Sequence, residues 1–135
     1  MDKKCSSPNN KNHARLILEG EIRFGPAYFK LELNGLRIPD KLFGDKLFWS
    51  HDSIYLATEE WLTTDYQKGP ITRLLLFNFQ TMKQSGFKRI EKGFVRDVTF
   101  FEDRLKYIKE YAATGRDIES EVEYSNIKNW INIGL

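Results

Sequence analysis

Short runs of alternating apolar and polar residues, separated by turn signals about every ten residues, fill most of this chain of 135 residues. In residues 28–33, for example, every second residue is apolar, and the Asn34-Gly35 pair that follows is a strong hairpin signal. Because successive side chains of a strand point to opposite faces, such runs fit half-buried strands. The pattern predicts an all-β, antiparallel domain, either a partial (half) β-propeller-like fold or a β-sandwich.

Individual segments give more specific predictions. Residues 47–63 and 95–111 each place a polar turn between two apolar runs and predict hairpins. The nearly continuous apolar run in residues 71–79 predicts a central strand covered on both faces. Residues 15–24 predict a half-buried strand whose inward face carries Leu18, Gly20, Ile22 and Phe24.

Length and composition indicate one folded domain. Hydrophobic residues make up 41% and charged residues 30% of the chain, which argues against global disorder. Residues 1–13 are rich in Ser, Asn and Lys and predict a flexible N-terminal tail before a single domain over 14–135. The net charge is +2, and beyond residue 14 basic and acidic residues cancel, so a broad basic footprint for nucleic acid is absent from the sequence.

The compartment is predicted from what the sequence lacks. Cys5 is the single cysteine, so no intrachain disulfide can form. The N-terminus has no apolar signal-peptide core, and no stretch approaches the roughly 18 apolar residues of a membrane span. We therefore expect a soluble, cytoplasmic protein with no membrane partner.

Catalytic and metal-binding patterns are weak. Ser50, His51, Asp52 and Ser53 are consecutive, and consecutive turn residues point apart, so we expect Asp52 to stabilise its own turn. Glu59 and Glu60 are neighbours on a predicted strand and face opposite ways. With one cysteine, two histidines and no phosphate-binding loop, we expect no enzyme activity, no cofactor and no metal site.

The segment from residue 117 to residue 124 is the most informative one for function. As a strand it places Asp117, Glu119, Glu121 and Glu123 on one face. The plainest interpretation is a solvent-facing strand whose charge is neutralised by Arg104, Lys106 and Lys109 of the preceding strand. A calcium site and a helix through 117–131, which would scatter the carboxylates, remain alternatives.

The functional interpretation is a binding site for a basic protein. Complementary charge speeds association and selects partners, and aromatic side chains dominate binding hot spots. The predicted partner-binding residues are Asp117, Glu119, Glu121, Glu123, Trp61, Tyr66 and Tyr124.

Other binding functions are alternatives. In residues 87–96, Phe87 and Phe94 alternate with basic residues, a pattern that could bind single-stranded nucleic acid, although the balanced net charge weighs against this. A β-domain that binds or processes a small molecule or glycan is a further alternative.

Two phrases of the chain resemble the hairpins of β-propeller blades. FWSHDSIYLAT (48–58) followed by RLLLFNFQTMK (73–83) resembles a blade's inner hairpin and next strand, and VTFFEDRLKYI (98–108) is similar to the same phrase starting again. A closed propeller needs at least four blades, more than this chain can supply. The resemblance therefore implies an incomplete fan of twisted sheets or a sandwich built from such units.

A small β-domain of this kind also resembles the immunity proteins of bacterial contact-dependent growth inhibition systems. The resemblance implies a non-catalytic protein that neutralises a cognate toxin, such as a nuclease, by covering its active site.

Overall fold

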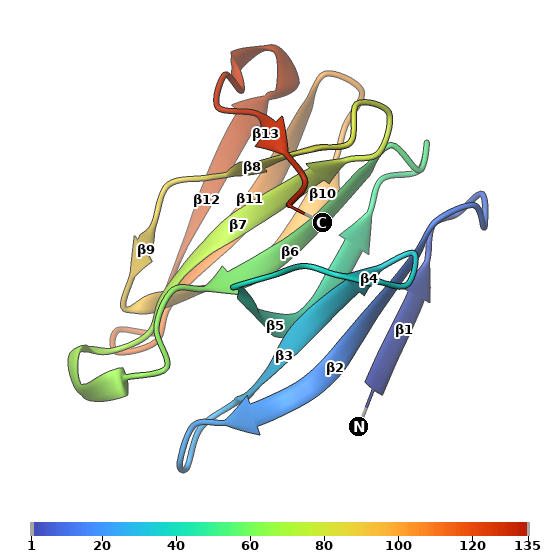
Figure 1. Ribbon diagram of the computed structural model, residues 1–135. Coiled ribbons are helices and arrows are strands. Elements are labelled where there is room, and N and C mark those ends of the chain that lie inside the picture. The colour runs from blue at the N-terminus through green and yellow to red at the C-terminus, as the bar shows by residue number, and fades with distance from the viewer. Residues whose placement is uncertain (1, 135) are drawn as a thin grey trace.

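The computed structural model describes residues 2–134 and consists of two antiparallel β-sheets (Figure 1). The large sheet has ten strands: β1 (Asp2–Ser6), β2 (His13–Glu21), β3 (Ala27–Leu33), β4 (Leu36–Arg37), β5 (Leu42–Trp49), β6 (Tyr55–Trp61), β7 (Ile71–Asn78), β8 (Lys83–Gly86), β9 (Ile90–Glu91) and β13 (Ile131–Asn132). The small sheet has three: β10 (Gly93–Phe100), β11 (Arg104–Tyr111) and β12 (Arg116–Glu123). Single 3-10 turns lie at Tyr66–Lys68 (η1) and Tyr124–Asn126 (η2).

The large sheet folds back on itself at β5. The pairing of β5 with β6 shifts register between Phe43 and Leu47, and β5 pairs with β3 at Phe43. An irregularity of this kind bends a strand and increases its twist. The apolar side chains of β2 and β3 therefore meet those of β6 and β7, and together they enclose a first core of Ala14, Leu16, Phe29, Leu31, Leu33, Ile38, Phe43, Leu56, Leu75, Phe77 and Ile133.

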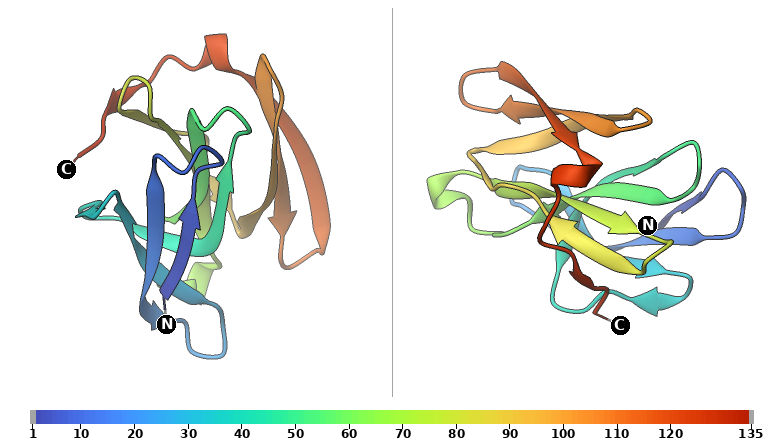
Figure 2. Two further views of the ribbon diagram at one scale, coloured as in Figure 1. Left: turned by 90° about the vertical axis from the view of Figure 1, so that its right-hand side faces the viewer. Right: turned by 90° about the horizontal axis from the view of Figure 1, so that it is seen from above.

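The small sheet packs against the opposite face of β6 and β7 (Figure 2). This contact forms a second core of Ala57, Leu74, Leu76, Ile90, Val95, Val98, Leu105, Tyr107 and Ile127. Strand β7 contributes Leu75 and Phe77 to the first core and Leu74 and Leu76 to the second, each at most 1% exposed. The prediction of a central strand covered on both faces is confirmed, and the all-β, antiparallel, sandwich-like fold is the one that the alternation predicts.

Residues 2–13 belong to the fold, which corrects the prediction of a flexible tail over residues 1–13; residue 1 lies outside the described residues. From Asp2 onward they form β1, which pairs with β2 over five residue pairs. In the loop that follows, Ser7 is 2% exposed, donates its N–H to the carbonyl of Asn12 (2.8 Å) and its hydroxyl to Oδ1 of Asn9 (2.7 Å). The polar composition is misleading here because an edge strand is held by backbone hydrogen bonds and needs few apolar side chains.

The strand predicted over 15–24 exists as β2, but its buried face differs from the prediction. Leu16 is fully buried, whereas Leu18 is 42% and Phe24 is 97% exposed. The register with β3 shifts between Leu18 and Gly20, and the strand ends at Glu21 before a tight turn. A register shift changes which residues face the core, and alternation alone does not reveal it.

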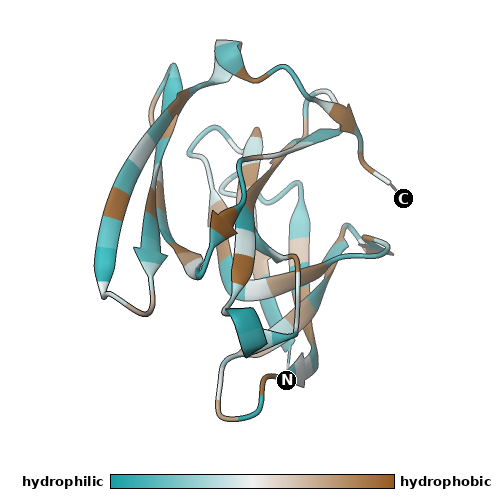
Figure 3. Cartoon of the chain, turned by 90° about the vertical axis from the view of Figure 1, so that its left-hand side faces the viewer, coloured by the Kyte–Doolittle hydropathy of each residue, from teal (hydrophilic) through white to brown (hydrophobic). Residues whose placement is uncertain are grey.

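The predicted hairpins are confirmed. Residues 47–63 contain the β5–β6 hairpin and residues 95–111 the β10–β11 hairpin. Asn34 and Gly35 join β3 to β4 with φ values of 51° and 84°, as an Asn-Gly hairpin turn requires. Teal and brown segments follow one another along the strands in Figure 3. In β11 buried residues alternate with less buried ones at Leu105 and Tyr107, whereas β6 is buried on both faces because it lies between the two cores.

Candidate functional site

The predicted acidic strand is β12, the last strand of the small sheet. Val122 packs against the second core, so the alternate residues face outward. A strand over residues 116–123 replaces the alternative of a helix through 117–131. The outward face of β12 carries four exposed carboxylates, which we call the acidic row: Asp117, Glu119, Glu121 and Glu123.

Cations of the other two strands of the small sheet pair with the acidic row. Arg104 and Lys106 of β11 do so as predicted, and Arg96, at a register shift of β10, adds a third cation that the sequence did not indicate. The ion pairs are Arg96–Asp117 (2.7 Å), Lys106–Glu119 (3.2 Å), Lys106–Glu121 (3.5 Å) and Arg104–Glu121 (3.5 Å).

Lys109, also predicted to neutralise the acidic row, lies on the other face of the small sheet. It is in register with Ile118, and its Nζ lies 5.6 Å from the ring centre of Tyr107. Burial, and then the nearby charge of Lys88, lower the pKa of its ammonium group. Side chains alternate between the two faces along a strand. Because Lys109 is three residues from Lys106, the two lysines point to opposite faces of the small sheet.

The outer face of the small sheet stays acidic despite these pairs. Six carboxylates against three cations leave a net charge of −3. The paired side chains are 30–54% exposed, and ion pairs in such settings stabilise a fold by only about 0.2–1 kcal/mol each. The pairs of Arg104 and Lys106 with the row can therefore be broken at little cost. The six carboxylates are the acidic row together with Asp97 and Glu110.

The three predicted aromatic anchors take different places. Tyr124 directly follows the acidic row; its ring stacks on Tyr55 with centroids 4.6 Å apart, and its hydroxyl donates to the carbonyl of Phe101 (2.9 Å). Trp61 is 5% exposed and packs as a core side chain 5.9 Å from the half-buried ring of Tyr66. The structure thus turns Tyr124 inward, where it packs against the second core and away from the acidic row, and places Trp61 and Tyr66 in another aromatic cluster.

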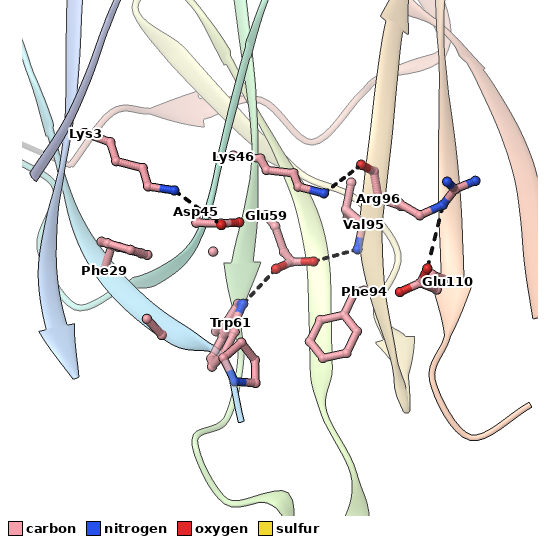
Figure 4. A pocket seen from close by; sticks show the side chains of 13 residues that line it. Lys3, Phe29, Asp45, Lys46, Glu59, Trp61, Phe94, Val95, Arg96 and Glu110 are labelled. Carbon is pink, nitrogen blue, oxygen red and sulfur yellow. Dashed lines mark hydrogen bonds and ion pairs between the residues drawn. The ribbon is translucent and has the colours of Figure 1, made fainter. Parts of the chain in front are cut away.

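A pocket of about 420 Å³ opens between β5, β6 and β10 (Figure 4). Its walls include Phe29, Trp61 and Phe94, and its rim carries both positive and negative side chains. Arg96 and Glu110 belong both to this rim and to the outer face of the small sheet, so the pocket adjoins the Asp117 end of the acidic row. The remaining residues that line it are Lys3, Pro26, Ala27, Gly44, Asp45, Lys46, Glu59 and Val95.

Glu59 lies in this pocket and joins the two sheets. It is 8% exposed; one carboxyl oxygen accepts from Nε1 of Trp61 (2.8 Å) and the other from the backbone N–H of Val95 in β10 (2.6 Å). Burial raises the pKa of Glu59 to about 7, although both hydrogen bonds act in the opposite direction. Gly44 passes so close that a Cβ atom there would overlap the carboxyl group.

Glu60 points to the opposite side of β6, as the alternation predicted. It is 4% exposed, and its two carboxylate oxygens pair with Nε of Arg73 (2.8 Å) and Nζ of Lys41 (3.2 Å). Glu59 and Glu60 therefore do not share a site. Sequence reasoning missed the role of Glu59, and the available signal was a carboxylate on the same strand face as Ala57 and Trp61.

The aromatic residues of 87–96 do not form a joint stacking surface. Phe87 packs 5.9 Å from the ring of Tyr107, whereas Phe94 packs 6.4 Å from Trp61. Base stacking needs an exposed ring face, and both rings are half-buried in separate clusters. The arrangement gives no support to the single-strand nucleic-acid alternative.

The Ser50–Ser53 segment forms a turn. Asp52 Oδ1 accepts from the hydroxyl of Ser50 (2.6 Å) and from the N–H of Ile54 (3.0 Å), which is the turn-stabilising role predicted for it. Within residues 2–134, no group of three or more His, Cys, Asp or Glu side chains is arranged to hold a metal ion. No helix in that range has the length and apolar character needed to cross a bilayer.

Comparisons with protein-family models, with curated proteins and with solved structures give no match to this chain. Its function is therefore inferred from its own residues.

Proposed function

We propose that this protein is a non-catalytic binding domain that recognises a basic protein through the outer face of its small sheet. The single observation that supports this most strongly is the acidic row, four exposed carboxylates on one strand face with a net charge of −3 around them. A face with this charge attracts a basic surface over distances of about a Debye length and repels an acidic one.

Within this class, we propose an immunity function in the bacterial cytoplasm. A toxin that cleaves nucleic acid must present positive charge to phosphates, and a carboxylate row can occupy that surface and block the active site. Rapid association matters for such an inhibitor, and charge complementarity raises association rates. The proposed partner is a cognate toxin of a contact-dependent growth inhibition system.

The pocket supports a second candidate function, binding of a small molecule or glycan. It combines apolar walls with one buried carboxyl group that can accept or donate a hydrogen bond near neutral pH. Mass spectrometry of protein purified under native conditions would test it. A stoichiometric small molecule, retained equally by variants of the acidic row, would support this function in place of partner binding.

The experiment for the first proposal compares two double charge reversals. The tagged protein captures its partner from the host, and the affinity of the purified pair is then measured for wild type, E119K/E121K and E19K/E21K. Glu19 and Glu21 are exposed on β2, so the control changes the net charge equally at another place. We expect E119K/E121K to weaken binding by about 100-fold and the control by less than about twofold.

Two results would contradict the proposal. One is an equal effect of the two double variants, which would mean that only net charge matters. The other is a partner with an acidic binding surface. Circular dichroism of each variant verifies that a loss of affinity is not a loss of fold.

A further inference from the structure

Strand β12 forms an edge of the small sheet, and among residues 2–134 no strand pairs with its outer side. It pairs with β11 on one side, and the order β10-β11-β12 ends with it (Figure 2). Its register with β11 runs over eight residue pairs without a shift, and it contains no proline. Edge strands are commonly protected by bulges or prolines, because an open edge can pair with another strand. Neither protection is present along β12.

The backbone groups that face this open edge belong to the acidic row. The N–H of Tyr124 donates to the carbonyl of Asp103 (3.1 Å), one position beyond the last residue pair of the β11–β12 ladder. Antiparallel pairs alternate between hydrogen-bonded and non-hydrogen-bonded ones. Ile118, Ser120 and Val122 therefore bond to β11, and the N–H and C=O groups of the acidic row point to the open edge.

The other edge of the small sheet is occupied by side chains of the large sheet. On β10, Glu59 accepts the N–H of Val95, the hydroxyl of Thr72 donates to the carbonyl of Gly93 (2.9 Å), and Lys46 reaches the carbonyl of Arg96 (3.4 Å). In residues 2–134, no hydrogen bond of this kind reaches the edge-facing backbone groups of the acidic row. The difference marks β12 as the edge that is available to a partner.

We propose that the β12 edge accepts an extended, basic segment of the partner as a fourth strand of the small sheet. This inference rests on the proposed function and specifies its binding mode, which is strand addition. An incoming strand would bond to the backbone of the acidic row and place every second side chain on the outer face, about 5.5 Å between Cα atoms from each carboxylate-bearing residue. Lysine or arginine at those positions would pair with the row.

Charge decides which strand fits. A second copy of β12 would bring carboxylates against carboxylates, which is unfavourable for directly opposed pairs. An uncharged strand would leave the net charge of −3 in place. A segment that alternates basic residues with apolar or hydroxyl residues satisfies both the backbone and the acidic row, and it is the occupant that the edge selects.

Amide hydrogen exchange measured by NMR tests the binding mode. The probe is an eight-residue peptide that alternates lysine with threonine, and the control peptide has glutamate in place of lysine. In the free protein, amides of the acidic row should exchange rapidly and those of Ile118, Ser120 and Val122 slowly. The lysine peptide should slow the acidic-row amides by at least about tenfold, and the glutamate peptide should leave them unchanged.

A pair of variants separates the backbone from the charge. Glu119→Pro removes an edge-facing N–H without disturbing the bonds to β11, whereas Glu119→Thr removes only the carboxylate. We expect a loss of peptide affinity of about threefold for Glu119→Thr and of more than about tenfold for Glu119→Pro. Ser120→Pro removes a hydrogen bond to β11 and should unfold the small sheet. This result would verify which backbone groups of β12 bond to β11 and which face the open edge.

The outcomes distinguish the two proposals. If E119K/E121K abolishes peptide binding but the acidic-row amides stay fast in the wild-type complex, strand addition is overturned and the acidic face remains the binding surface. Equal affinities of Glu119→Pro and Glu119→Thr would overturn it in the same way. If the lysine peptide does not bind, or binds equally to E119K/E121K, both proposals fail.

Discussion

Carboxylates occur in two contrasting regions of this molecule. Glu59 and Glu60 lie inside, on the central strand β6, at 8% and 4% exposure, and each is held by two hydrogen-bond donors. The acidic row lies outside on β12. Its cations are partly exposed, and Lys106 is shared by two carboxylates, whereas Glu123 has no ion pair within 4 Å among the described residues. Glu59 joins the two sheets and Glu60 ties β6 to β7 and Lys41, whereas the outer carboxylates remain exposed to solvent.

The difference comes from the cost of removing a carboxylate from water. A buried charge must find partners within the fold or take up a proton, and the two inner residues show one solution each: Glu60 pairs with two cations and Glu59 has a raised pKa. An exposed carboxylate keeps its hydration and needs no partner. Any ion pair it makes can be exchanged for a stronger one with another protein.

The largest expected effect is that of Glu60→Ala on stability. The substitution leaves Arg73 and Lys41 without their common partner, and both side chains are only 21–29% exposed. We expect the free energy of unfolding to fall by about 3 kcal/mol in urea denaturation. The control, Glu91→Ala, removes an exposed pair with Arg89 and should cost less than about 0.5 kcal/mol. Similar losses for both variants would erase the distinction between inner and outer carboxylates.

The next effect is a pH dependence caused by Glu59. Its pKa is about 7 in the folded protein, against an ordinary value of 4.5 for a glutamate, so the folded state binds more protons between these pH values. Below pH 4.5 this proton contributes about 3 kcal/mol to the free energy of unfolding. That contribution is lost as the pH rises from 4.5 to 7. Denaturation of wild type and Glu59→Gln across this range should show that loss in the wild type only. Parallel profiles would mean that Glu59 does not titrate there.

A smaller effect is expected at Gly44. A methyl group there would overlap the carboxyl of Glu59 and press on the indole of Trp61, so Gly44→Ala should cost about 2 kcal/mol. The control is Gly134→Ala, where the nearest atom to the added Cβ, in Pro39, is 3.8 Å away. Thermal unfolding of both variants is sufficient. An unchanged melting temperature for Gly44→Ala would show that the inner carboxyl is less tightly enclosed than its contacts indicate.

The smallest effect on stability is expected in the acidic row. Glu119→Gln and Glu121→Gln remove exposed charges and should change the free energy of unfolding by less than about 0.5 kcal/mol each. The same urea titration measures this. A loss above about 1 kcal/mol would indicate that the acidic row contributes to folding stability, contrary to this account.

Sequence patterns predicted where the strands and turns lie better than they predicted the register shifts between strands. The apolar run of β7, the Asn34-Gly35 turn and the face of the acidic row all follow from side-chain period and turn chemistry, which are local. The exposure of Phe24 and the arrival of Arg96 beside Asp117 depend on register shifts between strands, which are not local. The inward position of Lys109, three residues from Lys106, follows from the alternation itself.

The site shows the same limit. The acidic row could be predicted because one strand carries all of it. The enclosure of Glu59 requires β5, β6 and β10 to meet, and the burial of Trp61 requires the packing of two sheets. Neither can be derived from the spacing of residues within a single segment.

The most direct test of the acidic face is the rate of association with the captured partner as a function of ionic strength, measured by stopped-flow for wild type, E119K/E121K and E19K/E21K. We predict fast association of the wild type and of E19K/E21K that slows steeply with added salt. For E119K/E121K we predict slow association with little salt dependence. Identical rates and salt dependences for all three proteins would contradict the account, because the acidic row would then take no part in recognition.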